Sequence, residues 1–209
     1  MANSLEITRS IQADAEKLLS ERFGKKIVIN SFTSIGGGCI NHATKIETNV
    51  GPFFLKWNAN CQNDIFLREA ESLKELKKAA GNYLVIPEVY VAKIVDDTPG
   101  FLVQDYLPVR ISKSDDDEKL GRGLAVIHQF RSSKFGFYHN NYCGATLQNN
   151  TWKKSWADFF RDNRIHFLLD QIQKSRPLPS SKIKTYNKLL DKIPDLLPEK
   201  SIPVLIHGD

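Results

Sequence analysis

A run of small, flexible residues near the N-terminus has the composition of an anion-binding loop. Three successive glycines and a cysteine lie between two β-branched segments: Gly36, Gly37, Gly38 and Cys39. Glycine lets the backbone approach a polyphosphate closely and offers it N–H groups that donate hydrogen bonds. The spacing differs from that of the GxxxxGK[ST] phosphate loop. Taken alone, these glycines are more typical of a flexible hairpin turn.

Two residues of opposite charge follow this loop. Lys56 interrupts the apolar segment FFLKWN, where a half-buried amine needs a partner. Glu69 comes 13 residues later, in the second turn of a predicted helix. A glutamate in that place could hold the lysine against α- and β-phosphates. Each residue also has a plainer explanation, because an edge lysine can extend to water and the same helix carries the solvated candidates Glu71 and Glu75.

The C-terminal residues combine an apolar segment with a proton acceptor. The sequence PVLI leads into His207, Gly208 and Asp209, which places a carboxylate at the mouth of a predicted sheet. A carboxylate there could accept the proton of an attacking hydroxyl group. Because Gly-Asp is also common turn chemistry, this tripeptide by itself predicts only a turn.

The elements that must position these groups follow from the hydrophobic pattern. Apolar residues recur at helical spacing between Ser4 and Gly24, which predicts a first helix. A second, strongly amphipathic helix is predicted at 65–80, between Asp64 and Gly81. Alternating β-branched and aromatic residues predict five strands, at 27–32, 43–48, 53–57, 89–95 and 101–107.

The character of the sequence changes at Pro108. The pattern after it predicts three helices, with Pro194 ending the last of them, and a short strand at 202–206. These helices are expected at 115–130, 151–174 and 181–193, with a loop at 135–150. We therefore expect an α+β fold with a mixed lobe at 1–107 and a mostly helical lobe at 108–209.

Composition limits the classes of function. The 209 residues are 41% apolar and 25% charged, as in globular proteins, which excludes a disordered or collagen-like chain. A net charge of +5 suits nucleotide ligands but is too weak to predict nucleic-acid binding. Cys39, Cys61 and Cys143 form no CxxC pair, which favours neither zinc nor a disulfide framework and indicates a reducing cytoplasm. No signal segment or 18-residue apolar run predicts contact with a membrane.

In combination and in this order, the features resemble a protein-kinase-like fold with two lobes. More specifically, the chain resembles the fructosamine and ketosamine kinases, relatives of the aminoglycoside phosphotransferases. The resemblance covers nearly the whole chain. It rests on GGGCIN, FLKWN, FLREAESL, FLVQDYL, LGRGLAVIH, the CG at 143–144, QNNTW at 148–152, WADFF at 156–160, Arg164 and the final VLIHGD.

This resemblance implies a role for each matching residue. The ATP site would comprise Gly36, Gly37, Gly38, Cys39, Lys56, Glu69, Gln104, Asp105 and Tyr106. Within it Lys56 would bind the phosphates, Glu69 would orient Lys56, and residues 104–106 would meet adenine through their backbone. Asp209 would be the catalytic base, and the substrate pocket would comprise Cys143, Asn150, Trp152 and His207. An aromatic platform beside an amide is a physically sensible sugar site.

The reaction that the resemblance implies is ATP-dependent phosphorylation of a sugar hydroxyl on fructosamine or ribulosamine adducts of amines or protein lysines. The phosphorylated sugar would then leave the amine, which amounts to deglycation. Two alternatives stay open from the residues themselves. One is a kinase for another small alcohol or an aminoglycoside, and the other is a truncated, non-catalytic chain that binds nucleotide.

Two further expectations come from the same resemblance. The family motif continues past Asp209 with residues that hold Mg²⁺, so no metal ligand is expected within the chain, and the 209 residues alone are expected to have little activity. Family members also use a cysteine at the position of Cys39 for disulfide-linked pairing. The resemblance therefore implies a disulfide-linked homodimer through Cys39, and the alternative is that Cys39 is simply a small residue that fits the loop.

Overall fold

The computed structural model describes residues 4–36, 41–60, 64–96, 98–111 and 113–208. It divides into two compact units, Met1–Leu124 and Ala125–Asp209. The division falls within helix α3 (Asp116–Ile127), later than the boundary after Leu107 that the sequence predicted. The reason is close packing, since a Cβ added at Gly123 would lie 2.2 Å from Cγ of Leu84. The start of α3 is thereby attached to the first unit.

The first unit is built on one antiparallel sheet of five strands, as predicted. The strands run in the order β1-β2-β3-β5-β4. Their bounds are β1 Ile29–Ile35, β2 His42–Thr48, β3 Gly51–Asn58, β4 Val89–Lys93 and β5 Gly100–Asp105. The β2–β3 turn needs a glycine because Gly51 has a φ of 122°, and the hydroxyl of Thr48 donates to its carbonyl at 2.7 Å.

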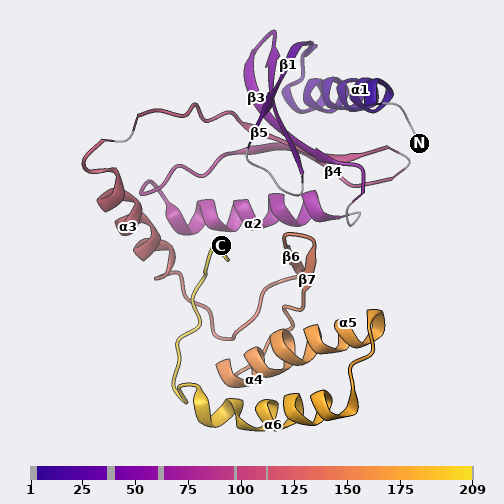
Figure 1. The fold of residues 1–209 in the computed structure, drawn as a ribbon. Helices are drawn as coiled ribbons and strands as arrows, with labels where there is room; N and C mark the ends of the chain where they lie inside the picture. The colour runs from indigo at the N-terminus through magenta and orange to yellow at the C-terminus, as the bar shows by residue number, and fades with distance from the viewer. Residues whose placement is uncertain (1–3, 37–40, 61–63, 97, 112, 209) are drawn as a thin grey trace. The chain divides into compact units, whose positions relative to one another are not determined.

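The two predicted helices of this unit are confirmed, and they cover opposite faces of the sheet (Figure 1). Helix α1 (Ser4–Phe23) buries Ile11, Ala15 and Leu19, which are four residues apart and therefore lie on one stripe. They pack in one core with Leu55 and Val103 of the sheet. Helix α2 (Ile65–Ala80) covers the other face and buries Ile65, Phe66, Ala79 and Ala80.

The second unit is helical with one small hairpin. Its elements are β6 Asn141–Cys143, β7 Thr146–Gln148, α4 Trp156–Phe160, the π-helical η1 Arg161–His166, α5 Phe167–Ser175 and α6 Ser180–Leu196. The hairpin lies within the predicted loop at 135–150 and turns at Gly144, whose φ is 59°. The helix predicted at 151–174 begins only at Trp156, because Ser155 caps it by accepting from the Asp158 amide at 3.1 Å.

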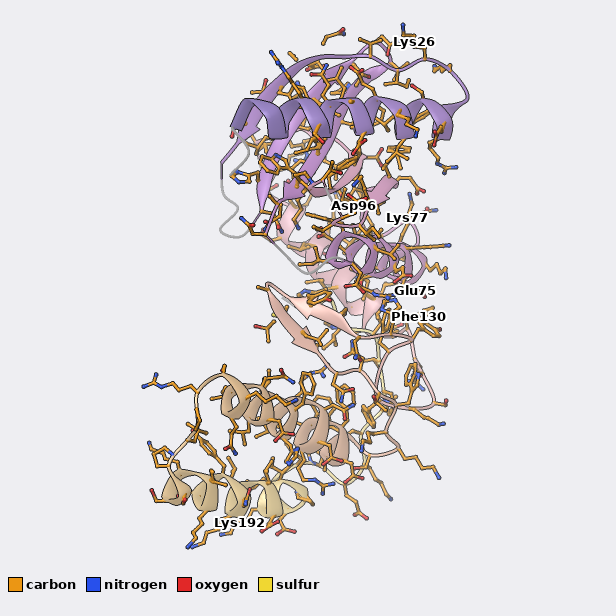
Figure 2. The ribbon with its side chains drawn as sticks, turned by 90° about the vertical axis from the view of Figure 1, so that its right-hand side faces the viewer. Lys26, Glu75, Lys77, Asp96, Phe130 and Lys192 are labelled. Atoms are coloured by element: carbon orange, nitrogen blue, oxygen red, sulfur yellow. The ribbon has the colours of Figure 1, made fainter. Side chains whose placement is uncertain are left out.

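Two predictions for the C-terminal part are wrong. Helix α6 continues through Pro194 to Leu196, since a proline this near the helix end removes one hydrogen bond while Leu190 and Ile193 stay buried. The strand predicted at 202–206 is an isolated bridge between Val204 and Arg131, with no further strand beside it among the described residues. Charged residues such as Lys192 lie on the exposed side of α6 (Figure 2). None of the described helices combines the length and apolar character that crossing a bilayer requires.

Candidate active site

The predicted pairing of Lys56 and Glu69 is confirmed. The Lys56 Nζ atom donates to both carboxylate oxygens of Glu69, at 2.9 and 2.8 Å. The two side chains come from β3 and the second turn of α2, and they are 27% and 30% exposed. Because the pair is partly buried, water competes only weakly for its hydrogen bonds. The remaining exposure leaves the ammonium group accessible to a ligand.

The sheet face that carries Lys56 also carries an unsatisfied acceptor. Lys56 pairs with Leu102 in the β3–β5 register, and Phe54 pairs with Gln104, so all four side chains share that face. The Oε1 atom of Gln104 is buried and has no hydrogen-bond partner among the described residues. Because a buried acceptor is costly to leave open, this atom suits a ligand that donates a hydrogen bond, as the amino group of adenine does.

Asp105 and Tyr106 follow Gln104 at the end of β5, and their side chains are already engaged. The Asp105 carboxylate accepts from the Tyr90 hydroxyl at 2.6 Å and from the Glu88 amide at 2.8 Å. The Tyr106 ring lies under the ammonium group of Lys45, with 4.8 Å between Nζ and the ring centroid. A ligand at this segment would therefore meet its backbone and not the Asp105 carboxylate.

The hydrogen bond to Asp105 and partial burial raise the pKa of Tyr90 to about 12. A raised pKa means that the stabilisation is complete below pH 10 and is lost as the pH rises from 10 through 12. We expect the urea midpoint of the wild type to fall over that interval more steeply than that of Tyr90→Phe. If the urea midpoints of the two proteins fall equally with pH, the raised pKa of Tyr90 is wrong.

The predicted glycine loop lies mostly outside the described residues, because these exclude Gly37, Gly38 and Cys39. The residues that follow the loop contact β3 through their side chains. The amide of Asn58 donates to the amide oxygen of Asn41 at 3.0 Å, which ties β3 to the start of β2. The rings of His42 and Trp57 stack at 4.2 Å. These two contacts join the start of β2, which follows the loop, to β3, which carries Lys56.

Asn150, a predicted substrate residue, is occupied by internal hydrogen bonds in the second unit. It is 5% exposed, and its amide nitrogen donates to the His139 carbonyl at 3.1 Å and to Asn141 Oδ1 at 2.8 Å. Its amide oxygen accepts from Arg164 Nη2 at 2.8 Å. Since donors and acceptor are used, this side chain organises the loop and does not present a free amide to a sugar.

Arg164 is the residue whose role the sequence analysis missed. It lies in the π-helical segment, and besides Asn150 its guanidinium donates to the Asn149 carbonyl at 2.6 Å. It also stacks over the Phe159 ring at 4.5 Å. Burial lowers the pKa of Arg164. Arg164 is one of the residues on which the family resemblance rests. The sequence around it, however, gives no sign that its side chain binds the loop at 149–150.

Trp152 and its neighbour Tyr138 form the exposed aromatic surface of this unit. Trp152 is 36% and Tyr138 is 73% exposed, and their rings meet edge to face at 5.9 Å. The backbone below is held by Gly136, where a Cβ would lie 2.7 Å from the Asn150 carbonyl oxygen and 2.9 Å from the Trp152 ring. Tyr138 was not singled out from the sequence, although it belongs to the aromatic run FGFYH.

We expect Gly136→Ala to lower the free energy of unfolding by about 2 kcal/mol, because the added methyl group meets backbone and the φ of 143° is unfavourable for alanine. The measurement is urea denaturation. Gly121→Ala is the matched control, because Gly121 lies in α3 with nothing within 4 Å and should gain up to about 1 kcal/mol. Equal effects at the two positions would show that Gly136 is not constrained.

The other predicted substrate and catalytic residues are Cys143, which lies between Tyr138 and Trp152 in the sequence, and His207 and Asp209 at the C-terminal end. Cys143 is exposed and free, at the turn between β6 and β7. His207 is exposed, and its ring lies 6.1 Å from that of His128. The backbone before it is tethered to Phe130, which accepts from the Leu205 amide at 2.9 Å. Asp209 is outside the described residues, and the disulfide through Cys39 stays a prediction for the same reason.

The sequence of this chain is similar to those of known kinases. The protein "Protein-ribulosamine 3-kinase, chloroplastic" of Oryza sativa subsp. indica is 31% identical over 211 residues, which cover all of this chain and 60% of the rice protein. "Probable ketoamine kinase" of Vibrio cholerae is 30% identical over 194 residues, covering 91% of this chain and 65% of that protein. The chain thus spans less than two thirds of these relatives.

The fold agrees with solved structures. The crystal structure of "Putative fructosamine-3-kinase" from Haemophilus somnus 129PT superposes with a TM-score of 0.74 at 25% identity, covering 90% of this chain and 63% of that one. An aminoglycoside phosphotransferase shares the fold at a TM-score of 0.51 and 13% identity, covering 94% and 68%. The family model described as fructosamine kinase matches residues 11–209. With a match over nearly its whole length, the chain belongs to the fructosamine kinase family.

Proposed function

We propose that the protein transfers the γ-phosphoryl group of ATP to a hydroxyl group of a ketosamine, the adduct of a sugar with an amine. Family membership and relatives named as ribulosamine and ketoamine kinases support this activity. The structural observation that carries it is the double hydrogen bond from Lys56 to Glu69, at 2.9 and 2.8 Å. The cation that this pair fixes lies on the same face as the buried, unsatisfied acceptor of Gln104.

Lys56 has an N–H donor left over for the nucleotide. An ammonium group has three N–H donors, and Glu69 engages two, so Lys56 keeps one for an α- or β-phosphate oxygen. The loop of Gly36, Gly37, Gly38 and Cys39 would cover the phosphates. Gln104 would accept from the adenine amino group or lie beside it, while the backbone of Asp105 and Tyr106 borders the base.

On the acceptor side, Trp152 and Tyr138 would take the apolar face of the sugar, with Asn150 and Arg164 holding the loop beneath them. Cys143 and His207 would border that pocket. Asp209 would accept the hydroxyl proton while the sugar oxygen bonds to the γ-phosphorus and ADP leaves. ATP supplies the phosphoryl group. Mg²⁺ is the second expected cofactor and would neutralise charge on the phosphates during transfer, although the described residues contain no group of three candidate ligands that could hold it.

The test is a substrate panel with ATP, using the protein that carries this chain. The panel contains a ribulosamine and a fructosamine adduct of lysine, the parent lysine, and an aminoglycoside. We expect ADP release and a phosphorylated sugar only with the ketosamines, followed by recovery of free lysine. Turnover of the aminoglycoside, with none of the ketosamines, would make the protein a kinase for another alcohol.

A further inference from the structure

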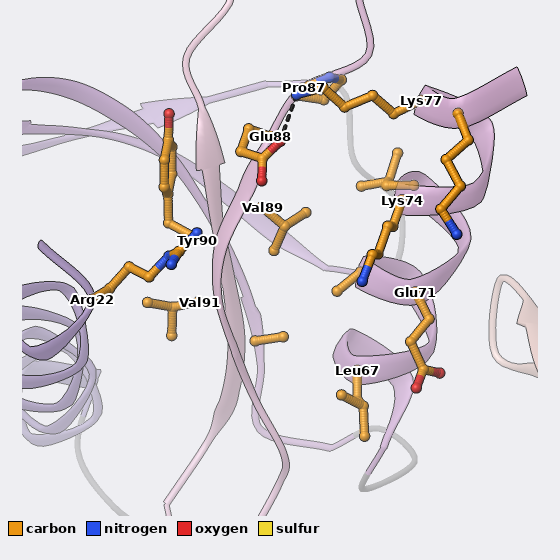
Figure 3. Close-up of a pocket in the computed structure, with 14 residues that line it drawn as sticks. Arg22, Leu67, Glu71, Lys74, Lys77, Pro87, Glu88, Val89, Tyr90 and Val91 are labelled. Atoms are coloured by element: carbon orange, nitrogen blue, oxygen red, sulfur yellow. Dashed lines mark hydrogen bonds and ion pairs between the residues drawn. The ribbon is translucent and has the colours of Figure 1, made fainter. Parts of the chain in front are cut away.

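A groove of about 680 Å³ lies in the first unit between helix α2 and strand β4 (Figure 3). It does not include Lys56, because β5 separates β3 from β4, although Val89 in the groove pairs with Gln104 in the β4–β5 register. Nothing in the proposed phosphoryl transfer uses its residues. The groove is therefore a surface whose shape and charge need a separate explanation.

The groove includes the free edge of the sheet. Strand β4 ends the strand order and pairs with β5 alone among the described strands. Six consecutive residues, 87–92, line the groove, and their side chains lie on both sides of the strand. Val89 is directed toward α2, whereas Tyr90 packs against Phe23 of α1 at 5.2 Å (Figure 3). The pairing of β4 with β5 is irregular between Val89 and Val91, and the other edge of β4 has no strand partner among the described residues. An edge strand of this kind can pair its outward backbone groups with an added strand.

The groove is apolar at its base and positively charged at its rim. Leu67, Ala70, Leu73 and Val89 supply the apolar wall. The rim has four basic residues, Arg22, Lys74, Lys77 and Lys78, and two acidic ones, Glu71 and Glu88.

Local pairing leaves part of that positive charge free. Lys77 pairs with Glu88 at 2.5 Å, and Lys78 pairs with Glu75 at 2.5 Å. Arg22 and Lys74 are exposed, and neither forms a hydrogen bond or ion pair within the described part of the chain. One of the two lies at the end of α1 and the other on α2, so they flank β4 on opposite faces of the sheet.

We propose that this groove binds an extended acidic segment of a partner protein, which adds to β4 as a sixth strand. An added strand satisfies the open backbone groups of the edge, and its side chains alternate between the two faces. Apolar side chains of the segment enter the wall at Leu73 and Val89. Carboxylates of the segment meet Lys74 on one face and Arg22 on the other.

The probe is a fluorescein-labelled eight-residue peptide of alternating glutamate and valine, followed by fluorescence anisotropy on the full chain without nucleotide. We expect saturable binding that weakens as salt is raised, because exposed charges contribute. The double variant Arg22→Glu, Lys74→Glu should weaken binding at least tenfold. Lys192→Glu, an exposed lysine on α6 in the other unit, is the control and should leave binding unchanged.

Two matched peptides separate this proposal from others. The lysine–valine peptide keeps the apolar residues and reverses the charge, so it should not bind. A glutamate–valine peptide with N-methylated amides along one edge keeps every side chain and should lose binding if a strand is added. Unchanged affinity for either peptide, or for the double variant, would overturn the proposal. So would binding of oligothymidylate in place of the acidic peptide. Because no nucleotide is present, the result is independent of the proposed kinase activity.

Discussion

Replacing Lys56 with methionine is expected to lower kcat/KM for ATP by on the order of 100-fold or more. Methionine keeps the length of the side chain and removes the cation that Glu69 holds at 2.8 Å. The lost interaction is strongest when charge develops on the transferred phosphoryl group, so kcat should fall more than the affinity for ATP. The measurement is steady-state turnover with a ketosamine, together with nucleotide titration calorimetry.

The partner residue supplies the control. Glu69→Gln keeps the shape and an acceptor but loses the charge, so it should lower activity in the same direction as Lys56→Met. The double variant should be little worse than the worse single variant, because the pair acts as a unit. Glu71→Gln, two residues along α2 and paired with Arg68 at 2.9 Å, should retain activity. If Glu71→Gln and Glu69→Gln lose activity equally, orientation of Lys56 by Glu69 is not what matters.

Replacing Asn150 with alanine is expected to lower the free energy of unfolding by roughly 2–4 kcal/mol. The substitution leaves the Arg164 guanidinium, the His139 carbonyl and Asn141 Oδ1 without the partners they have at 2.8–3.1 Å. Since these groups hold the loop that bears Trp152, tryptophan fluorescence should also change. Urea denaturation followed by fluorescence measures both effects.

A double-mutant cycle with Arg164→Ala tests the mechanism of that loss. If Asn150 and Arg164 stabilise the loop through each other, the double variant should lose less than the sum of the single variants. Asn187→Ala is the control for the amide itself, because Asn187 lies exposed on α6 and alanine favours helix there. Additive losses in the free energy of unfolding would mean that the two side chains act separately. If Asn150→Ala leaves the free energy of unfolding unchanged, Asn150 does not stabilise the loop.

Much of the first unit could be predicted because its signals are local and periodic. Helices α1 and α2 have apolar stripes at helical spacing, and the strands alternate between a core face and an outer face. Lys56 sits at a position of β3 that points away from Leu55 and therefore toward α2. A glutamate in the second turn of α2 is within reach of it, so the ion pair could be predicted from two element types and their order.

The second unit was predicted less well because its structure depends on groups distant in the sequence. The loop at 135–150 contains a hairpin, and its backbone is held by Asn150, Arg164 and Lys153, whose amide donates to the Phe135 carbonyl at 2.8 Å. Short strands of three residues carry almost no pattern. The π-helical segment of η1 is likewise invisible to a 3.6-residue period, although it sets the position of Arg164.

By itself the sequence determined the elements of the first unit, the ion pair of Lys56 and Glu69, and the kinase-like order of motifs, because each depends on periodicity or on short spacing. Only the tertiary structure decided which polar groups are already satisfied. Asn150 and Asp105 carry the residue types of a binding site, yet their side chains are engaged by Arg164 and Tyr90. A hydrogen bond between residues far apart in the chain has no periodic signature, so the free and the engaged polar groups become distinct only after folding.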